Sequence, residues 1–235
     1  MTNTEHTSKQ FDAELEAVRA RVLHMGGLVE EQIKLALDAL ISGDMELCTK
    51  VENNDHLVNG LEVGIDEDCS TIIARRQPAA GDLRMLMTVV KTITDLERIG
   101  DEAAKIARMA KLIYSADRLQ QPRTAEIRRM SQIALEMLRK SLDAFARLDL
   151  AASAEVVRRD QHVDEEFRGV LRQLITFMME DPRTISVSIE ILFIAKAIER
   201  IGDHAKNISE YVIYMVKGKD VRHVTLEEIE REVMG

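Results

Sequence analysis

Aromatic residues, prolines and cysteines are all scarce in this 235-residue sequence, which contains 3% aromatic residues, no tryptophan, three prolines and two cysteines. A β-sandwich normally needs more aromatic and β-branched side chains, so this composition favours packed amphipathic helices. Cys48 and Cys69 do not have the CxxC spacing of a metal site, and their positions indicate no disulfide. We interpret them as two reduced, packed thiols.

Long apolar runs and an excess of positive charge are also absent. No stretch reaches the ~18 consecutive apolar residues that span a bilayer, and the first ten residues, MTNTEHTSKQ, lack the apolar centre of a signal peptide. The net charge of −9 disfavours binding to the phosphate backbone of nucleic acid. We therefore expect a cytoplasmic protein that binds no nucleic acid and associates with a membrane only through a partner.

The sequence does have the apolar periodicity of long helices. Apolar residues make up 46% of the chain, and they recur at helical spacing rather than with the period of two that predicts a strand. Gly43 is placed to end the first helix, Asp44 to cap the second, and Asp181 with Pro182 to begin the sixth. The predicted helices span about 11–42, 45–76, 82–116, 122–147, 149–180 and 181–217, with a short tail helix from Thr225.

The sequence also repeats itself. The pentapeptide Glu-Arg-Ile-Gly-Asp at 97–101 recurs letter for letter at 199–203, an offset of 102 residues. Upstream positions match at an offset of 105, among them Asp55 with Asp160. Two blocks of identity in the same order are hard to attribute to chance, and they indicate a duplicated unit of three helices.

We therefore predict an all-α fold of two tandem, internally duplicated three-helix bundles, built from six long antiparallel helices. Residues 1–118 are the predicted first repeat, residues 119–218 the second, and residues 219–235 a C-terminal tail. The change of offset from 105 to 102 places a three-residue deletion near the start of the sixth helix.

Each copy of the pentapeptide places two carboxylates one helical turn apart, Glu97 with Asp101 and Glu199 with Asp203. Both pairs lie away from the apolar seam of their helix, so we expect them to point outward. Like charges at this spacing destabilise a helix by roughly 0.2–0.5 kcal/mol, so positive charge should compensate them. That charge could come from a neighbouring arginine, a basic partner or a hard cation such as Mg²⁺, Mn²⁺, Ca²⁺ or iron. A solvated charged face is the simpler alternative.

Further acidic side chains lie on the predicted middle helix of each repeat. Asp160 and Asp164 are one turn apart in the second repeat, and their counterparts in the first are Asp55 and Asn59. If the second and third helices of a repeat pack side by side, these oxygens can face the carboxylate pair of the pentapeptide. His204, which follows the second pentapeptide, points about 100° away from its last aspartate, and we expect a surface histidine.

Each copy of the pentapeptide is followed by an alanine and a helical tail, and each is preceded by acidic residues on the middle helix of its repeat. This pattern resembles the PhoU family, and the resemblance covers about residues 11–217. The resemblance implies a metal site in each repeat, with cofactors that are metal cations, in particular multinuclear iron, or else manganese, magnesium or zinc. Asn59 departs from the family pattern and gives the first site one negative charge fewer. The implied ligands are Asp55, Glu97 and Asp101 in the first repeat and Asp160, Asp164, Glu199 and Asp203 in the second.

The same resemblance implies regulation rather than catalysis. PhoU proteins are similar to one another in being cytoplasmic, often dimeric, negative regulators of phosphate uptake and of the phosphate-starvation response. The implied partners are the ATPase subunit of a phosphate ABC transporter, a phosphate-sensor histidine kinase, and a second copy of the chain in a homodimer. We expect no enzyme activity.

Two other classes of protein stay open. One is a metal-free helical adaptor that binds its partners by packing alone. The other is a carboxylate-bridged metalloenzyme, whose helix-bundle sites use Glu-x-x-His pairs. None of the six histidines has a glutamate three residues before it, which counts against the enzyme.

Overall fold

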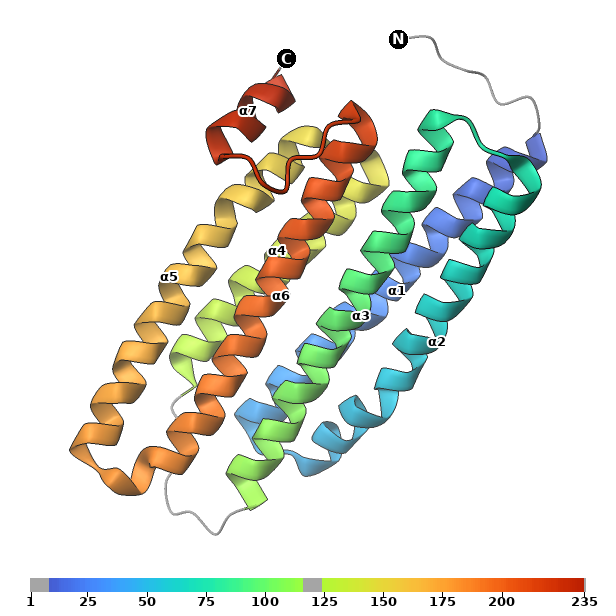
Figure 1. Cartoon of the computed structure of the whole chain (residues 1–235). Helices are drawn as coiled ribbons and strands as arrows, with labels where there is room; N and C mark the ends of the chain where they lie inside the picture. Colours follow the sequence, from blue (N-terminus) through green and yellow to red (C-terminus); the bar gives the residue numbers. More distant parts are fainter. Residues whose placement is uncertain (1–8, 116–123, 235) are drawn as a thin grey trace.

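A computed structural model of the chain describes residues 9–115 and 124–234. These residues are almost entirely helical, and the described part contains no β-strand, so the predicted all-α fold is confirmed. The helices, drawn in Figure 1, are α1 (Lys9–Ser42), α2 (Met45–Arg76), α3 (Ala80–Ser115), α4 (Ala125–Arg147), α5 (Leu150–Glu180), α6 (Ile185–Lys217) and α7 (Leu226–Met234).

The turns between helices use capping residues that the sequence shows directly. Gly43 ends α1 in the left-handed conformation at φ 74°, and the Asp44 carboxylate accepts hydrogen bonds from the backbone N–H groups of Glu46 and Leu47. At the corresponding turn of the second repeat, Leu148 takes the position of Gly43 and adopts φ 58°. A side chain in this conformation costs roughly 1–2 kcal/mol, so the two turns are built alike at unequal cost.

The start of the sixth helix differs from the prediction. Pro182–Thr184 forms a separate 3₁₀ turn, in which the Asp181 carboxylate accepts from the backbone N–H of Arg183, and α6 begins at Ile185. Proline lacks the N–H that a helix interior needs, which suits it to such a short turn. The predicted start of the fourth helix near residue 122, and the predicted boundary between the repeats, lie outside the described residues.

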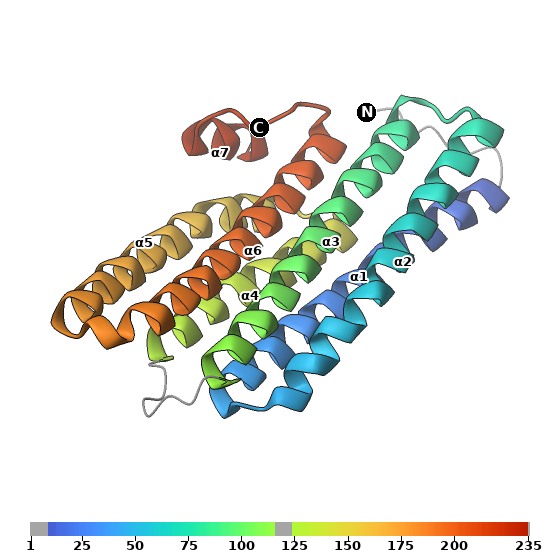
Figure 2. The same ribbon diagram turned by 60° about the horizontal axis from the view of Figure 1, so that its bottom comes forward.

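The helices form two three-helix bundles that lie side by side, α1–α3 in one and α4–α6 in the other (Figures 1 and 2). Helices α3 and α6 pack against each other at the centre, and one continuous hydrophobic core includes residues from both bundles. Gly26 of α1 also lies against Leu142 of α4, where an alanine Cβ would come within 2.7 Å of a leucine methyl. The repeats therefore share a core, and their relative position is fixed by packing.

Polar residues occur within the interface between α3 and α6. Asp95 of α3 is buried and accepts hydrogen bonds from His204 Nδ1 at 2.6 Å and from Asn207 Nδ2 at 3.2 Å, both on α6. Arg200 of α6 forms an ion pair with the buried Glu102 of α3. The predicted surface position of His204 is therefore wrong. The side chain does point away from the acidic pair on α6, but there it meets α3 of the other repeat.

The C-terminal helix α7 lies across α5 and the end of α6, where it forms a second, smaller hydrophobic cluster (Figure 1). Ile229 of α7 is buried in this cluster together with Ile213 of α6. The predicted capping box is present, since Thr225 and Glu228 exchange hydrogen bonds at its start. Among the helices of the described residues, none is long and apolar enough to cross a membrane.

Candidate metal sites in two carboxylate clusters

The first carboxylate cluster, Asp55 and Glu62 of α2 with Glu97 and Asp101 of α3, forms where α2 passes close to a glycine of α3. At Gly100 an added Cβ would lie 3.5 Å from Val58 Cγ1 and 3.7 Å from Asp55 Oδ1. The absence of a side chain at this position thus lets the Asp55 carboxylate approach the backbone of α3, beside the pentapeptide. The predicted packing of the second helix beside the third is present here.

Burial and mutual repulsion raise the pKa values of two acids in the first cluster. The pKa of Asp55 is raised by burial and then by the charge of Asp101. The pKa of Glu97 is raised by burial and then by the charges of Asp101, Glu62 and Asp55. Carboxylates that raise one another's pKa hold negative charge at a cost, which a bound cation would remove.

Hydrogen bonds compensate the first cluster only in part. Asn59 Nδ2 donates to Asp55 Oδ2 at 3.4 Å, and Thr94 Oγ1 donates to Glu62 Oε1 at 3.3 Å. Asp55 Oδ1 is buried and has no hydrogen-bond partner. Within the part of the chain that the structure describes, no lysine or arginine forms an ion pair with an acid of this cluster.

The second carboxylate cluster, Asp160 of α5 with Glu199 and Asp203 of α6, forms in the same way beside Gly202. There an added Cβ would lie 3.4 Å from Val163 Cγ1, one turn along α5 from Asp160. Burial, followed by the charges of Glu199 and Asp160, raises the pKa of Asp203 to about 6. The surroundings of Asp203 therefore disfavour its charged form in the metal-free protein.

Two lysines that the sequence analysis did not identify pair with two of the three acids of the second cluster. Lys206 Nζ donates to Asp160 Oδ2 at 2.8 Å, and Lys196 Nζ donates to both oxygens of Glu199 at 2.6 and 2.5 Å. Lys196 stands three residues before Glu199, a spacing visible in the sequence. The pairing of Lys206 with Asp160 joins two helices, so only their relative register reveals it.

The predicted site residues are placed partly as expected. Asp101 is exposed, as predicted, whereas Glu97, Glu199 and Asp203 are half-buried because they face the neighbouring helix of their own bundle. Asp164 is half-buried one turn beyond Asp160, and it is not among the charges that act most strongly on Asp203. The structure thus brings together all the predicted residues of the first repeat and three of the four in the second.

The oxygen donors of both clusters suit a hard cation such as Mg²⁺, Mn²⁺ or Ca²⁺. The buried, unpartnered Asp55 Oδ1 is the kind of atom that such a cation would satisfy. Among the described residues, however, no three side chains of Asp, Glu, His or Cys converge closely enough to hold one ion by themselves. A cation at either cluster would therefore keep several of its water ligands, as Mg²⁺ commonly does.

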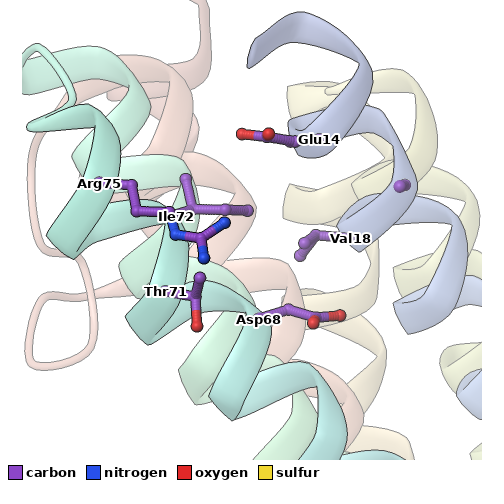
Figure 3. A pocket seen from close by; sticks show the side chains of 7 residues that line it. Glu14, Val18, Asp68, Thr71, Ile72 and Arg75 are labelled. Atoms are coloured by element: carbon purple, nitrogen blue, oxygen red, sulfur yellow. The ribbon is translucent and has the colours of Figure 1, made fainter. Parts of the chain in front are cut away.

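A pocket elsewhere in the first repeat, about 250 Å³ in volume, lies between α1 and α2. Figure 3 shows Glu14 and Val18 of α1 facing Asp68, Thr71 and Ile72 of α2. Its two acids already have cationic partners on the opposite helix, Arg76 for Glu14 and Arg21 for Asp68. Because these charges are compensated, whereas the acids of the first carboxylate cluster have no ion-pair partner among the described residues, the first cluster is the stronger candidate site.

The fold and the two clusters define a class of protein: a duplicated three-helix bundle in which each repeat places carboxylates from two helices beside a glycine. The model of the PhoU domain matches residues 22–110 and residues 127–212 of the chain. This chain belongs to the PhoU family.

Similar proteins and structures agree with this assignment. The chain is 48% identical over 231 residues to a protein of Pseudomonas aeruginosa named phosphate-specific transport system accessory protein PhoU homolog, covering 98% of this chain and 95% of that one. It is 46% identical over 230 residues to the accessory protein PhoU of Escherichia coli, with the same coverage of both chains. The relatives are named as accessory proteins, not as enzymes.

Two solved structures share the fold. The crystal structure of PhoU from Pseudomonas aeruginosa matches with a TM-score of 0.85 and 47% identity, covering 89% of this chain and 100% of that one. The structure of the phosphate transport system regulatory protein PhoU from Streptococcus pneumoniae matches with a TM-score of 0.83 and 29% identity, covering 90% and 99%. The predicted duplicated helical bundle is thus the fold of the family.

Proposed function

We propose that this protein is a cytoplasmic accessory protein of a phosphate transport system that binds metal cations and represses phosphate uptake and the phosphate-starvation response. The observation that carries the metal part is the duplicated carboxylate cluster, with its raised pKa values and its buried, unpartnered Asp55 oxygen. Family membership and the names of the relatives support the role in phosphate transport.

The first cluster would hold a cation through Asp55, Glu97 and Asp101. In the second cluster, Asp160, Glu199 and Asp203 are the corresponding acids, with Asp164 one turn away on α5. When bound, the cation supplies positive charge and open ligand positions for an anion or for a partner's oxygen atoms. The protein's own contribution is to hold the carboxylates on rigid, packed helices, so that a bound cation and the protein surface keep a fixed relation.

An adaptor also needs a surface for its partners, and exposed apolar side chains gather around the turn between α5 and α6. Ile185, Ile189 and Phe193 follow one face of α6 at a spacing of four residues, and each is more than 40% exposed. Met179 near the end of α5 is 80% exposed. We assign this surface to the ATPase subunit of the phosphate transporter, with a phosphate-sensor histidine kinase and a second copy of the chain as the other partners.

Co-purification from cells that co-express the ATPase subunit tests the adaptor role. The amount of ATPase subunit that co-purifies should fall at least tenfold with the double variant Met179→Ser, Phe193→Ser, because this variant removes two large apolar side chains from the surface. The matched control is Leu57→Ser, Val63→Ser, which removes two apolar side chains that are 47% and 57% exposed on α2. Equal recovery of the subunit with both double variants would contradict this assignment.

A reporter of the phosphate-starvation response tests the regulatory role. In a strain that lacks this gene, the reporter should be active at high phosphate, and the intact gene should silence it. A reporter that stays silent in the deletion strain at high phosphate would refute negative regulation.

The metal-free adaptor stays a second candidate because of one observation. The lysines at the second cluster already neutralise two of its acids, so that cluster can exist without a metal.

A further inference from the structure

Gln32 of α1 is a buried polar side chain directed at the first carboxylate cluster. Its side chain is 3% exposed, and neither its amide oxygen nor its amide nitrogen has a hydrogen-bond partner. A Cβ added at Gly100 would lie 3.3 Å from Gln32 Oε1 and 3.7 Å from Asp55 Oδ1, so both oxygens approach the same point of α3. The first cluster therefore has a third wall, contributed by α1.

An amide buried without hydrogen-bond partners destabilises the folded chain, and a carboxylate oxygen in the same state does so more strongly. Here two such groups from different helices lie against the same glycine. Buried polar groups in native proteins are normally satisfied by protein, water or ligand. An apolar residue at position 32 would avoid this cost, so the amide indicates a polar occupant beside Asp55.

The second repeat has no such arrangement. The residue that corresponds to Gln32 at the offset of 105 is Met137, which is fully buried in the core. The register is secure, because the buried residues of α4 all correspond to buried residues of α1 at this offset. Position for position, the second repeat has an apolar side chain where the first has an unpartnered amide.

The lysines that pair with cluster acids, in contrast, are present only in the second repeat. Lys196 and Lys206 neutralise the second cluster, and at the offset of 102 their counterparts in the first repeat are Thr94 and Ala104. Neither counterpart carries charge, and Ala104 is too short to reach Asp55. Because of Asn59, we expected the first site to carry less negative charge than the second. The two lysine ammonium groups reverse this order, since they reduce the net negative charge of the second site.

We propose that the two clusters are inequivalent: the first takes a hydrated divalent cation, Mg²⁺ or Mn²⁺, with Gln32 as an additional residue of its site, and the second is filled by its own lysines. This inference rests on the proposed metal binding and assigns it to one repeat. Gln32 offers an amide oxygen to the cation or to one of its water ligands, and Asp55, Glu97 and Asp101 supply the negative charge. In the second repeat, Lys206 and Lys196 occupy the carboxylates that a cation would need.

A titration of chelator-treated full-length protein with Mn²⁺ tests the proposal. Binding is measured as the loss of the electron paramagnetic resonance signal of free Mn²⁺. We expect the wild-type chain to bind one Mn²⁺. Gln32→Met, which installs the residue of the second repeat, should weaken that binding at least tenfold, and Asp101→Asn should weaken it at least 100-fold. The matched control is Asp143→Asn, which changes an exposed carboxylate of α4.

Removal of a lysine should create a second site. Lys206→Met should bind two Mn²⁺ per chain, and Lys196→Gln, which changes an exposed lysine, gives the same test if Lys206→Met does not fold. Far-ultraviolet circular dichroism checks the fold of each variant.

Two outcomes overturn the inference in distinguishable ways. Two equivalent Mn²⁺ ions in the wild type, with binding unchanged by Gln32→Met, would refute the inequivalence but leave the proposed metal binding intact. No Mn²⁺ bound to the wild type or to any variant would refute the metal binding itself, and this inference with it.

Discussion

Replacement of Asp203 by asparagine should stabilise the metal-free protein at neutral pH. Asp203 is half-buried beside Glu199 and Asp160, and burial with these charges raises its pKa from 3.8 to about 6. The charged form is therefore less favourable in the folded chain than in the unfolded one. Asparagine keeps the shape of the side chain and removes the charge.

The magnitude follows from the pKa. At about 1.4 kcal/mol for each pKa unit, a fully shielded aspartate with this pKa would cost about 3 kcal/mol. Asp203 is partly open to solvent, which screens its interactions, so we expect a gain of about 1–2 kcal/mol for Asp203→Asn at pH 7.5.

The pH dependence has a definite sign. A raised carboxyl pKa means that the folded state binds the proton more tightly, so stability falls as pH rises between the two pKa values. Well below pH 4 the aspartate is protonated in both states, so the stability difference between wild type and variant should vanish there and be small at pH 4. The difference should grow between about pH 4 and pH 6 and then stay constant.

Urea unfolding in the presence of a chelator, followed by circular dichroism at pH 4, 5, 6 and 7.5, measures this difference. The comparison of variant with wild type at each pH cancels the titration of other groups, such as Glu210, whose pKa burial raises to about 7. Asp143→Asn serves as the control on an exposed carboxylate. The reasoning is refuted if Asp203→Asn is no more stable than this control at pH 7.5, or if its advantage is the same at pH 4.

Three further substitutions test the fold. Leu148→Gly should raise the free energy of unfolding by up to about 1 kcal/mol, because it relieves the left-handed conformation of a largely exposed side chain; a loss of stability in urea would contradict this. Asp95→Ala should lower the free energy of unfolding by about 2–4 kcal/mol, because it leaves His204 and Asn207 without their shared acceptor inside the α3–α6 interface. An unchanged midpoint of urea unfolding would contradict this role of Asp95. Ile229→Asp should detach α7, so that trypsin removes the C-terminal segment within minutes while the six long helices stay protected; intact protein after that time would show that α7 remains docked.

The helical architecture could be predicted because its signals are local. Gly43 and Asp44 mark a turn whose chemistry depends on neighbouring residues alone, and the pentapeptide repeat reveals the duplication without reference to any contact. The spacing of four residues placed the two acids of each pair one turn apart on their own helix, but it did not show that Glu97, Glu199 and Asp203 are half-buried against the neighbouring helix.

Contacts between helices could not be predicted in the same way, because periodicity within one helix does not set the register of the next. His204 looked exposed when its own helix was considered alone, and it is buried against Asp95 of the other repeat. Lys206 likewise reaches Asp160 on α5, and Gln32 reaches the first cluster from α1. A lone amide on the apolar face of α1 was the one signal of that contact present in the sequence.

The most direct test of the central claim is elemental analysis of protein purified without chelator or metal-affinity resin. The comparison is with a variant in which Glu97, Asp101, Glu199 and Asp203 are all replaced by alanine. The account predicts a stoichiometric hard cation or iron in the native protein and its loss from the folded variant. A native protein without metal, or a folded variant that retains it, would contradict the assignment of metal binding to the paired carboxylates.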